Sequence, residues 1–406
     1  MHTTDLGPLI ERTVIRLDEL CLPFPDRAVG SPGGNAANDY VAGELTAMGA
    51  SVERIGFDCV VWEPVAATIE VGGETPEISC GPYSPSIDVS APLVAVSSLE
   101  ELGAAELGGR IVVLHGDIAA EQIGPKNYPF YRLDDHMRII ERLESSGAAA
   151  VIGITGHHPT SAGALDPFPL FEDGDFAVPS VYASRSQGEA LLTHAGKTAH
   201  LVIDSLVTPG RADQLIGRLP GTGPGRVVVS AHVDSRRGTP GALDNATGVC
   251  VLLGAAELLA ADPPSCSVEL VPFNGEDNFA AYGEMAYLSA YGDGLSDVGL
   301  AINIDAAGLP GGPSAVSTYS CPEQTVALIA RLVEADPFVE CGPVWPMSDH
   351  MVFAMRGVPA AAITSMDFAT VNGSIAHAPH DLPGLADPEV VARTARFVAN
   401  LIRALY

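Results

Sequence analysis

Residues 227–234 decide the fold and read Val227-Val228-Val229-Ser230-Ala231-His232-Val233-Asp234. Their apolar, β-branched start predicts a buried strand, and their end is polar. Open α/β sheets place binding sites outside the carboxyl ends of such strands. His232 and Asp234 are two residues apart, so they project from the same face of an extended chain. This spacing suits a metal ligand and a carboxylate that holds its imidazole, although a surface His and Asp would give the same pair.

Strand and helix patterns alternate around this stretch. From Asp213 onward the chain reads as strand, turn and helix in repetition, over residues 226–231, 248–261, 267–273, 280–290 and 299–304. Such alternation predicts an α/β fold with a mostly parallel, mixed sheet flanked by helices. The glycine-rich residues 221–225 lack the Lys-Ser/Thr of a phosphate loop and read as a tight turn.

The N-terminal part supplies further elements of the same domain. Apolar residues at helical spacing predict helices over residues 5–22 and 36–48, the second with Asn35 as its N-cap. Residues 51–58 read as the first strand.

A second domain is predicted in the middle of the chain. After residue 58 come short β-type runs separated by turn residues, with one amphipathic helix over 134–145. A chain of 406 residues is long for a single domain. We therefore expect one domain built from residues 1–58 and 207–406, with a smaller β-rich domain, residues 59–206, inserted in it.

The composition excludes several classes of protein. The net charge is −29, with 50 acidic residues against 21 Lys and Arg, so no nucleic acid and no anionic membrane is expected as a partner. The first thirty residues hold no apolar run of signal-peptide length, and we expect no stretch to approach the length of a membrane span. Seven scattered cysteines favour reduced thiols and a cytoplasmic protein over a disulfide framework. The acidic surface fits either a soluble protein or a salt-adapted source, and the oligomeric state is left open.

Acidic residues and a histidine stand at several other element ends. Asp244 precedes a hydrophobic helix, where it reads either as an N-cap or as a carboxylate that bridges two metal ions. Glu276 and Asp277 follow another apolar strand, and adjacent acids repel unless a cation lies nearby. Their side chains diverge, so one can hold a metal while the other takes a proton from water. Asp305 ends a third apolar strand, and His377 lies in a late loop.

Each of these residues alone has a structural explanation, but five sites at the ends of separate strands are harder to dismiss. The ligand candidates are His232, Asp244, Asp277, Asp305 and His377. Two His, three Asp and no Cys favour zinc or a similar divalent ion in a hydrolytic site over a structural one.

Basic and imidazole groups near these residues could contact substrate. Arg236 and Arg237 stand between two ligand candidates. They read either as a loop paired with nearby acids or as a clamp for a substrate carboxylate, which the planar guanidinium suits. His350 is placed near the expected pocket as a candidate substrate contact, although a structural position would fit it as well.

The motifs, in their order, resemble those of the co-catalytic di-zinc exopeptidase family, of the aminopeptidase Y and glutamate carboxypeptidase II type. The matching motifs are His-x-Asp from 232, Gly-Ala-x-Asp-Asn from 241, Gly-Glu-acid from 275, apolar-Asp ending at 305 and His-x-Pro-x-Asp from 377. Residues 27–33 and 348–360 are similar to the family's N-terminal and late segments. The inserted residues 59–206 more loosely resemble a protease-associated domain that would cover the substrate.

This resemblance implies a role for each site residue. Asp244 would bridge two zinc ions, although other divalent ions could serve. His232 and Asp305 would complete the site of one ion. Asp277 and His377 would complete the other, and Glu276 would be the general base. Asp234 is expected beside His232 as its supporting carboxylate.

The chain departs from the family's pattern at three places. Asp277 stands where Glu is usual, Ala376 stands where an aromatic residue is usual, and residues 278–284 lack the common Gly-Leu-x-Gly-Ser run. We therefore expect an altered geometry at one metal position and an unusual substrate pocket.

Three functions remain in view. The first is an aminopeptidase that removes N-terminal residues from peptides. The second is a carboxypeptidase or N-acyl amidohydrolase that reads a carboxylate of a peptide or small amide. The third is a binding protein that keeps the fold without catalysis, against which the complete set of ligands and base argues.

Overall fold

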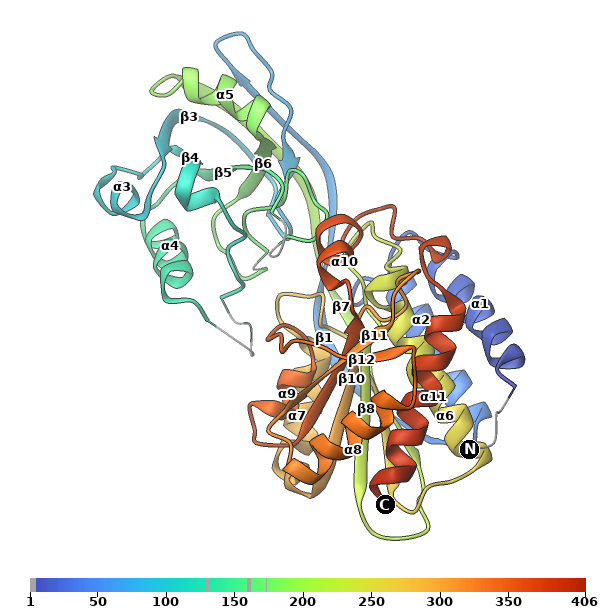
Figure 1. Ribbon diagram of the computed structural model, residues 1–406. Helices are drawn as coiled ribbons and strands as arrows, with labels where there is room; N and C mark the ends of the chain where they lie inside the picture. The colour runs from blue at the N-terminus through green and yellow to red at the C-terminus, as the bar shows by residue number, and fades with distance from the viewer. Residues whose placement is uncertain (1–4, 127, 129–131, 159–161, 173) are drawn as a thin grey trace. The chain divides into compact units, whose positions relative to one another are not determined.

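The computed structural model describes residues 5–126, 128, 132–158, 162–172 and 174–406 (Figure 1). It contains two compact units, Met1–Cys59 with Arg211–Tyr406, and Val60–Gly210. The sequence predicts these breaks after residues 58 and 206. Both breaks fall within or beside long strands, since β1 spans Ser51–Val71 and β7 spans Thr198–Leu219.

The first unit contains parts of β1 and β7 together with the rest of the α/β elements. These are α1 (Gly7–Cys21), α2 (Pro32–Ala47), β8 (Arg226–His232), α6 (Thr247–Ala261), β9 (Ser267–Phe273), α7 (Tyr282–Tyr291), β10 (Val298–Ile304), β11 (Ser314–Tyr319), α8 (Glu323–Glu334), β12 (Val339–Cys341), α9 (His350–Ala354), β13 (Ala360–Ser365), α10 (Phe368–Ser374) and α11 (Pro388–Leu405).

The sheet of this unit is mixed and mostly parallel, as the sequence predicts. Its strands follow the order β12-β11-β13-β10-β8-β9-β7. Strands β13, β10, β8 and β9 are parallel to one another, whereas β11 runs antiparallel to β13 and β7 antiparallel to β9. In this register His232 lies opposite Phe273, the last residue of β9. The carboxyl ends of β8 and β9 therefore meet at one edge.

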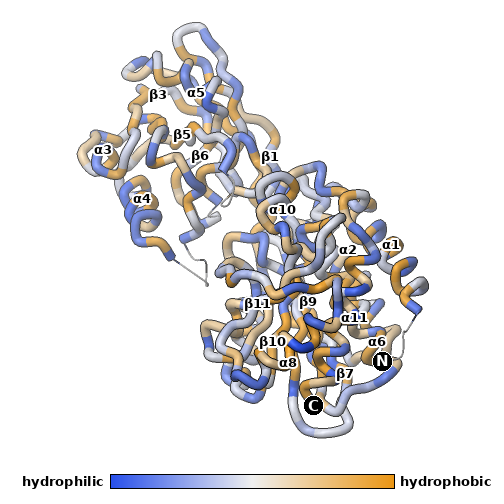
Figure 2. Tube along the Cα trace, in the orientation of Figure 1, coloured by the Kyte–Doolittle hydropathy of each residue, from blue (hydrophilic) through white to orange (hydrophobic). Residues whose placement is uncertain are grey.

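Helices cover both faces of this sheet. Helix α6 packs on β8, β9 and β10 beside α1, α2 and α11, and α9 contacts β10 and β13; α7 and α9 lie on the side away from α6 and α11 (Figure 1). Figure 2 shows apolar residues along the central strands β9 and β10. Val249, Val251 and Leu253 of α6 are all fully buried, so the core lies between this helix layer and the sheet.

One expectation about hydrophobic length is wrong. Residues Ala242–Ala261 are long and apolar enough to cross a membrane by length and composition. However, 89% of that window is buried inside the protein. Within the described residues this stretch is therefore the core helix of the unit, which must be apolar on all sides.

The second helix begins earlier than the sequence suggests. Its N-cap is Ser31, whose hydroxyl accepts the backbone N–H of Gly34 at 3.0 Å, and Pro32 occupies the first helical turn. Asn35, the expected cap, lies inside the helix. The Gly/Pro-rich sequence reads as a turn, but proline at the first helical position has its φ already set for a helix.

The second unit contains its own parallel strands and helices. They are β2 (Ser79–Cys80), β3 (Ile87–Val96), α3 (Leu99–Ala104), β4 (Ile111–Leu114), α4 (Asp134–Ser145), β5 (Ala150–Thr155), β6 (Ser180–Ser184) and α5 (Arg185–Thr193). Strands β3, β4, β5 and β6 pair in parallel in that order. The likeness of this unit to a protease-associated domain stays a prediction.

Candidate metal centre

The site candidates gather at the carboxyl edge of the parallel strands. His232 is the last residue of β8, and Asp305 directly follows β10. Glu276 and Asp277 stand in the short loop after β9. Since β9, β8 and β10 are neighbours in the sheet, these side chains converge without any long connection.

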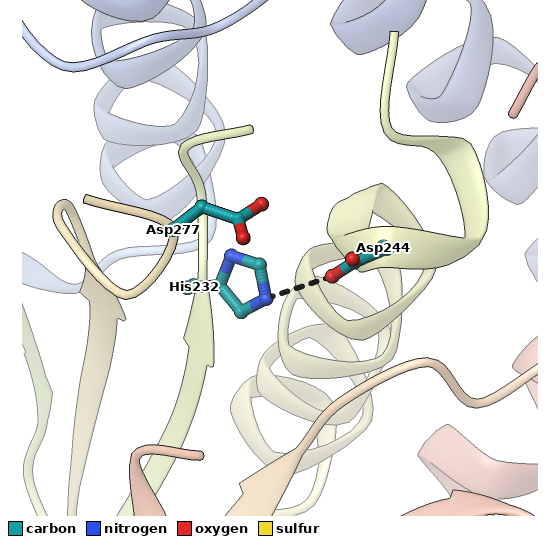
Figure 3. Close-up of side chains that lie close together, drawn as sticks. All are labelled: His232, Asp244 and Asp277. Carbon is teal, nitrogen blue, oxygen red and sulfur yellow. Dashed lines mark ion pairs between the residues drawn. The ribbon is translucent and has the colours of Figure 1, made fainter. Parts of the chain in front are cut away.

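Asp244 lies at the centre of the cluster and turns one carboxylate oxygen to each histidine. Its Oδ1 is 3.2 Å from Nε2 of His232, and its Oδ2 is 3.3 Å from Nε2 of His377. Nε2 of His377 is 3.2 Å from Oδ1 of Asp277, and Nε2 of His232 is 3.6 Å from Oδ1 of Asp305. Figure 3 shows His232 between Asp244 and Asp277. Each of these three residues offers one ligand atom, and the three atoms lie within 4.8 Å of one another.

The backbone around Asp244 is irregular, which favours the bridging role over the helix cap. Asp244 belongs to the short segment Ala242–Ala246 and has φ −117° and ψ 85°, outside the helical region. The N-cap of α6 is Ala246. The backbone N–H groups of Leu243 and Asp244 donate to the carboxylate of Asp381, at 2.8 and 3.0 Å. Asp381 therefore fixes the direction in which Asp244 points.

His377 reaches the cluster from a strained position. It follows α10 and has φ 64°, a left-handed conformation that a residue with a side chain adopts only when its surroundings impose it. Its carbonyl accepts the hydroxyl of Thr239, from the loop after His232, at 3.1 Å. This bond ties the late loop to the loop that joins two other ligand candidates.

Asp234 lies beside His232, where its carboxylate forms an ion pair with the imidazole, and it also contacts the loop after β9. Its Oδ1 is 3.7 Å from Nδ1 of His232, beyond hydrogen-bond distance, while its backbone carbonyl is 3.2 Å from that nitrogen. The carboxylate also accepts the backbone N–H groups of Gly275 at 2.9 Å and Asp277 at 3.1 Å. Asp234 thus anchors the loop that carries Glu276 and Asp277, because donors of that loop lie nearer to the carboxylate than the imidazole does.

Arg27 supports the ligand loop, a role that the sequence pattern does not show. Its guanidinium is buried, and it donates to the carbonyls of Val233 at 2.8 Å and Gly241 at 2.9 Å, and to that of Pro240. Its backbone N–H donates to the hydroxyl of Ser235. A single arginine more than 200 residues away in the chain thus spans the loop between His232 and Asp244.

Burial and charge act against each other at the two imidazoles. Burial lowers the pKa of His232, but the carboxylates of Asp234, Asp244 and Asp305 outweigh it and raise that pKa well above the ordinary value. Burial and Arg236 lower the pKa of His377, and Asp277 and Asp244 raise it to about 9. The carboxylate cluster therefore requires positive charge beside it.

A divalent cation fits this requirement. Nε2 of His232 is buried and has no hydrogen-bond partner among the described residues, although three carboxylates surround it. Neutral imidazole nitrogens and carboxylate oxygens are the donors that zinc accepts. A cation among these donors would supply the charge that protonated histidines otherwise must provide.

Glu276 lies at the edge of the same cluster. Its Oε2 is 4.0 Å from Nε2 of His232, and its side chain is 15% exposed. Burial raises the pKa of Glu276 well above its ordinary value, and the charge of Asp305 adds to the effect while His232 opposes it. A cation in the cluster would oppose this rise and favour the ionised carboxylate, which can take a proton from water.

The three predicted substrate contacts are engaged with protein groups. Arg236 Nε donates to Oδ1 of Asp277 at 3.2 Å, and Arg237 pairs with Asp26 at 3.7 Å. His350 is fully buried, and its Nε2 lies 2.9 Å from the carbonyl of Trp345. Burial lowers the pKa of His350 to about 4, so this neutral imidazole donates its N–H to Trp345. These positions favour structural roles, and substrate contact by the three residues stays a prediction.

A buried pair of acids, Glu284 and Asp349, lies behind the cluster and was missed in the sequence. No donor among the described residues reaches their four carboxylate oxygens. Burial, with Asp234 adding, raises the pKa of Glu284 to about 8, so the pair holds a proton at neutral pH. A Cβ at Gly275 would lie 2.7 Å from the backbone nitrogen of Tyr282 and 2.8 Å from Oε2 of Glu284, which explains the glycine there. Only the unusual Glu after Gly283 could have signalled this pair.

Comparison with known proteins finds a family whose pattern covers this site. The sequence pattern of Peptidase family M28 matches residues 214–402, which contain every ligand candidate. A probable lipoprotein aminopeptidase, LpqL, of Mycobacterium tuberculosis is 26% identical over 283 residues. That alignment covers 69% of this chain but 54% of the relative, so the chain spans about half of the length of that protein.

Solved structures share the fold over nearly the whole chain. An aminopeptidase from Aneurinibacillus sp. strain AM-1 superposes with a TM-score of 0.76 at 21% identity, over 97% of this chain and 93% of that one. BSAP, a zinc aminopeptidase from Bacillus subtilis, gives 0.72 at 20% identity, over 98% and 94%. Residues 214–402 thus match the pattern of peptidase family M28, and the fold is similar to that of these two structures over nearly the whole chain.

Proposed function

We propose that this chain is a zinc-dependent aminopeptidase with two metal positions that share Asp244. The observation that carries the proposal is the orientation of Asp244, whose Oδ1 faces His232 and whose Oδ2 faces His377. One carboxylate placed between two imidazoles, each with a further Asp beside it, suits a pair of cations. The names of the relatives, two of them aminopeptidases and one a zinc aminopeptidase, support the same activity.

Each side chain has a separate task in the proposed reaction. Zinc held by these donors would polarise the scissile carbonyl and lower the pKa of attacking water toward about 7. Glu276 takes the proton from that water and returns it to the leaving amine. Asp234 holds the loop of Glu276 in place through the N–H groups of Gly275 and Asp277. Asp381 and Arg27 hold the loop of Asp244.

A substrate panel with and without metal tests this function. Metal-depleted protein titrated with zinc should reach two ions per chain and gain hydrolysis of peptides with a free N-terminus. The same peptides carrying an N-acetyl group should be resistant, and a chelator should abolish turnover until zinc is restored. Zinc-loaded protein that cleaves neither set would leave only the non-catalytic binding protein.

The alternative is a carboxypeptidase or N-acyl amidohydrolase that reads a carboxylate through Arg236 or Arg237. Both guanidiniums bind carboxylates of the protein, Asp277 and Asp26, so a substrate carboxylate would have to displace them. Preferential hydrolysis of N-acylated substrates, with loss of affinity when the substrate carboxylate is amidated, would favour this alternative over the aminopeptidase.

A further inference from the structure

The two proposed metal positions differ in the charge beside them. Asp305 lies on the side of His232. Among the described residues, His232 is the one ion-pair partner of Asp305. Asp277, on the side of His377, accepts in addition the Nε–H of Arg236 at 3.2 Å. The side chain of Asp277 is 3% exposed and that of Arg236 is 25% exposed. The Arg236–Asp277 ion pair is thus mostly shielded from solvent.

Arg236 and His377 share a single oxygen atom of Asp277. Oδ1 lies 3.2 Å from Nε of Arg236 and 3.2 Å from Nε2 of His377. A cation held between Asp277 and His377 would use the oxygen that faces His377. The guanidinium therefore competes with the cation for that oxygen, and it does not lose its proton at any pH at which the protein is folded.

Asp277 cannot easily turn its carboxylate away from this competition. Its side chain has a single methylene, and its backbone N–H is fixed to Oδ2 of Asp234 at 3.1 Å. Arg236 follows Asp234 closely in the chain, in the loop that Arg27 holds by the carbonyls of Val233 and Gly241. Both partners of the pair are therefore set in place by the framework.

We infer that Arg236 controls the occupancy of one metal position: the ion between Asp277 and His377 is held weakly and exchanges, whereas the ion between His232 and Asp305 is retained. The inference rests on the proposed two-metal function and adds a regulation to it. Repulsion between a fixed guanidinium and a divalent ion weakens binding at the nearer position, since charges that are partly shielded from solvent interact more strongly than exposed ones. Turnover would then follow the free zinc concentration over the range in which the weaker position fills.

Stepwise zinc binding to the full chain tests this role. Metal-depleted wild type should bind two ions in two resolved steps by calorimetry with a competing chelator. In Arg236→Gln the weaker step should tighten by about tenfold or more, because the positive charge is gone while a side-chain donor remains. In Arg236→Lys, which keeps the charge, the weaker step should stay weak.

Arg237→Gln is the matched control. It removes the same charge from the next position of the same loop, but Arg237 pairs with Asp26 rather than Asp277, so both steps should stay as in the wild type. An unchanged or weakened second step in Arg236→Gln would overturn the inference, since Arg236 would then orient Asp277 for the ion instead of opposing it. Failure of the proposed function looks different: the wild type would bind no zinc, or the fully loaded protein would hydrolyse nothing.

Discussion

The carboxylate of Asp234 accepts the backbone N–H of Asp277 at 3.1 Å, and this bond joins the strand of one ligand candidate to the loop of another. The other oxygen of Asp234 accepts the N–H of Gly275 at 2.9 Å. Asp234 is itself fully buried and lies two residues after His232. A single side chain therefore sets the distance between β8 and the loop that contains Glu276.

Replacing Asp234 with Ala should loosen that loop. The N–H groups of Gly275 and Asp277 lose their acceptor, so Glu276 and Asp277 no longer hold a fixed position. Removing a hydrogen-bond partner that orients a metal ligand commonly lowers metal affinity by about 10- to 100-fold. We expect a loss of zinc affinity in this range, measured by competition with a chelator. Asp234→Asn keeps one acceptor and should fall between the two. Wild-type zinc affinity in Asp234→Ala would contradict the anchoring role.

Glu276→Gln should separate catalysis from metal binding. The amide cannot take a proton from water, so turnover should fall by at least about 10²-fold, the low end for loss of a general base. Zinc content and thermal stability should stay near the wild type, because the ligand candidates remain. Asp277→Asn is the contrasting variant and should lose zinc as well as turnover. Turnover within a few-fold of wild type in Glu276→Gln would assign the base to another residue.

The sequence predicts the strands and their polar ends better than the bonds between them. His232 and Asp305 end apolar runs, and such runs show directly in the sequence because β8 and β10 are buried on both faces. The donor for Asp234 could not be predicted, because it depends on the path of the loop after β9, some forty residues later in the chain. Ser31 was missed as an N-cap because its glycine- and proline-rich surroundings are typical of a turn.

Arg27 illustrates the same limit over a longer distance. Its partners, the carbonyls of Val233, Pro240 and Gly241, are backbone atoms, so no side-chain pattern marks them. The burial of Glu284 against Gly275 could likewise not be predicted, because it follows from how α7 packs behind the loop. Periodicity predicts the elements and their faces, whereas these contacts follow from tertiary packing.

Arg27→Met should destabilise the first unit strongly. The apolar side chain fills similar space but leaves the carbonyls of Val233, Pro240 and Gly241 without their donor. Leaving a buried acceptor unsatisfied costs about 1–3 kcal/mol, so the free energy of unfolding should fall by about 3 kcal/mol or more in denaturant titration. Arg54→Met is the control, because it removes a half-exposed arginine whose partners are Asp39 and Asp213. This variant should change the free energy of unfolding by about 0.5 kcal/mol or less. Equal losses in both variants would contradict the bracing role of Arg27.

Glu284 should make the free energy of unfolding depend on pH from weakly acidic to weakly basic conditions. Burial, with the charge of Asp234 adding, raises the pKa of Glu284 from 4.5 to about 8. Between these two values the folded chain keeps a proton that the unfolded chain has lost, so the free energy of unfolding decreases as pH rises through this window. Glu284→Gln is neutral throughout and removes this part of the decrease. Between about pH 5 and about pH 8, the free energy of unfolding of the zinc-loaded wild type should therefore fall by about 1 kcal/mol or more relative to that of the variant. Thermal unfolding measures this difference. Glu11→Gln, on the exposed side of α1, should keep the wild-type slope. A Glu284→Gln variant with that same slope would show that the buried carboxyl is ionised in the folded protein.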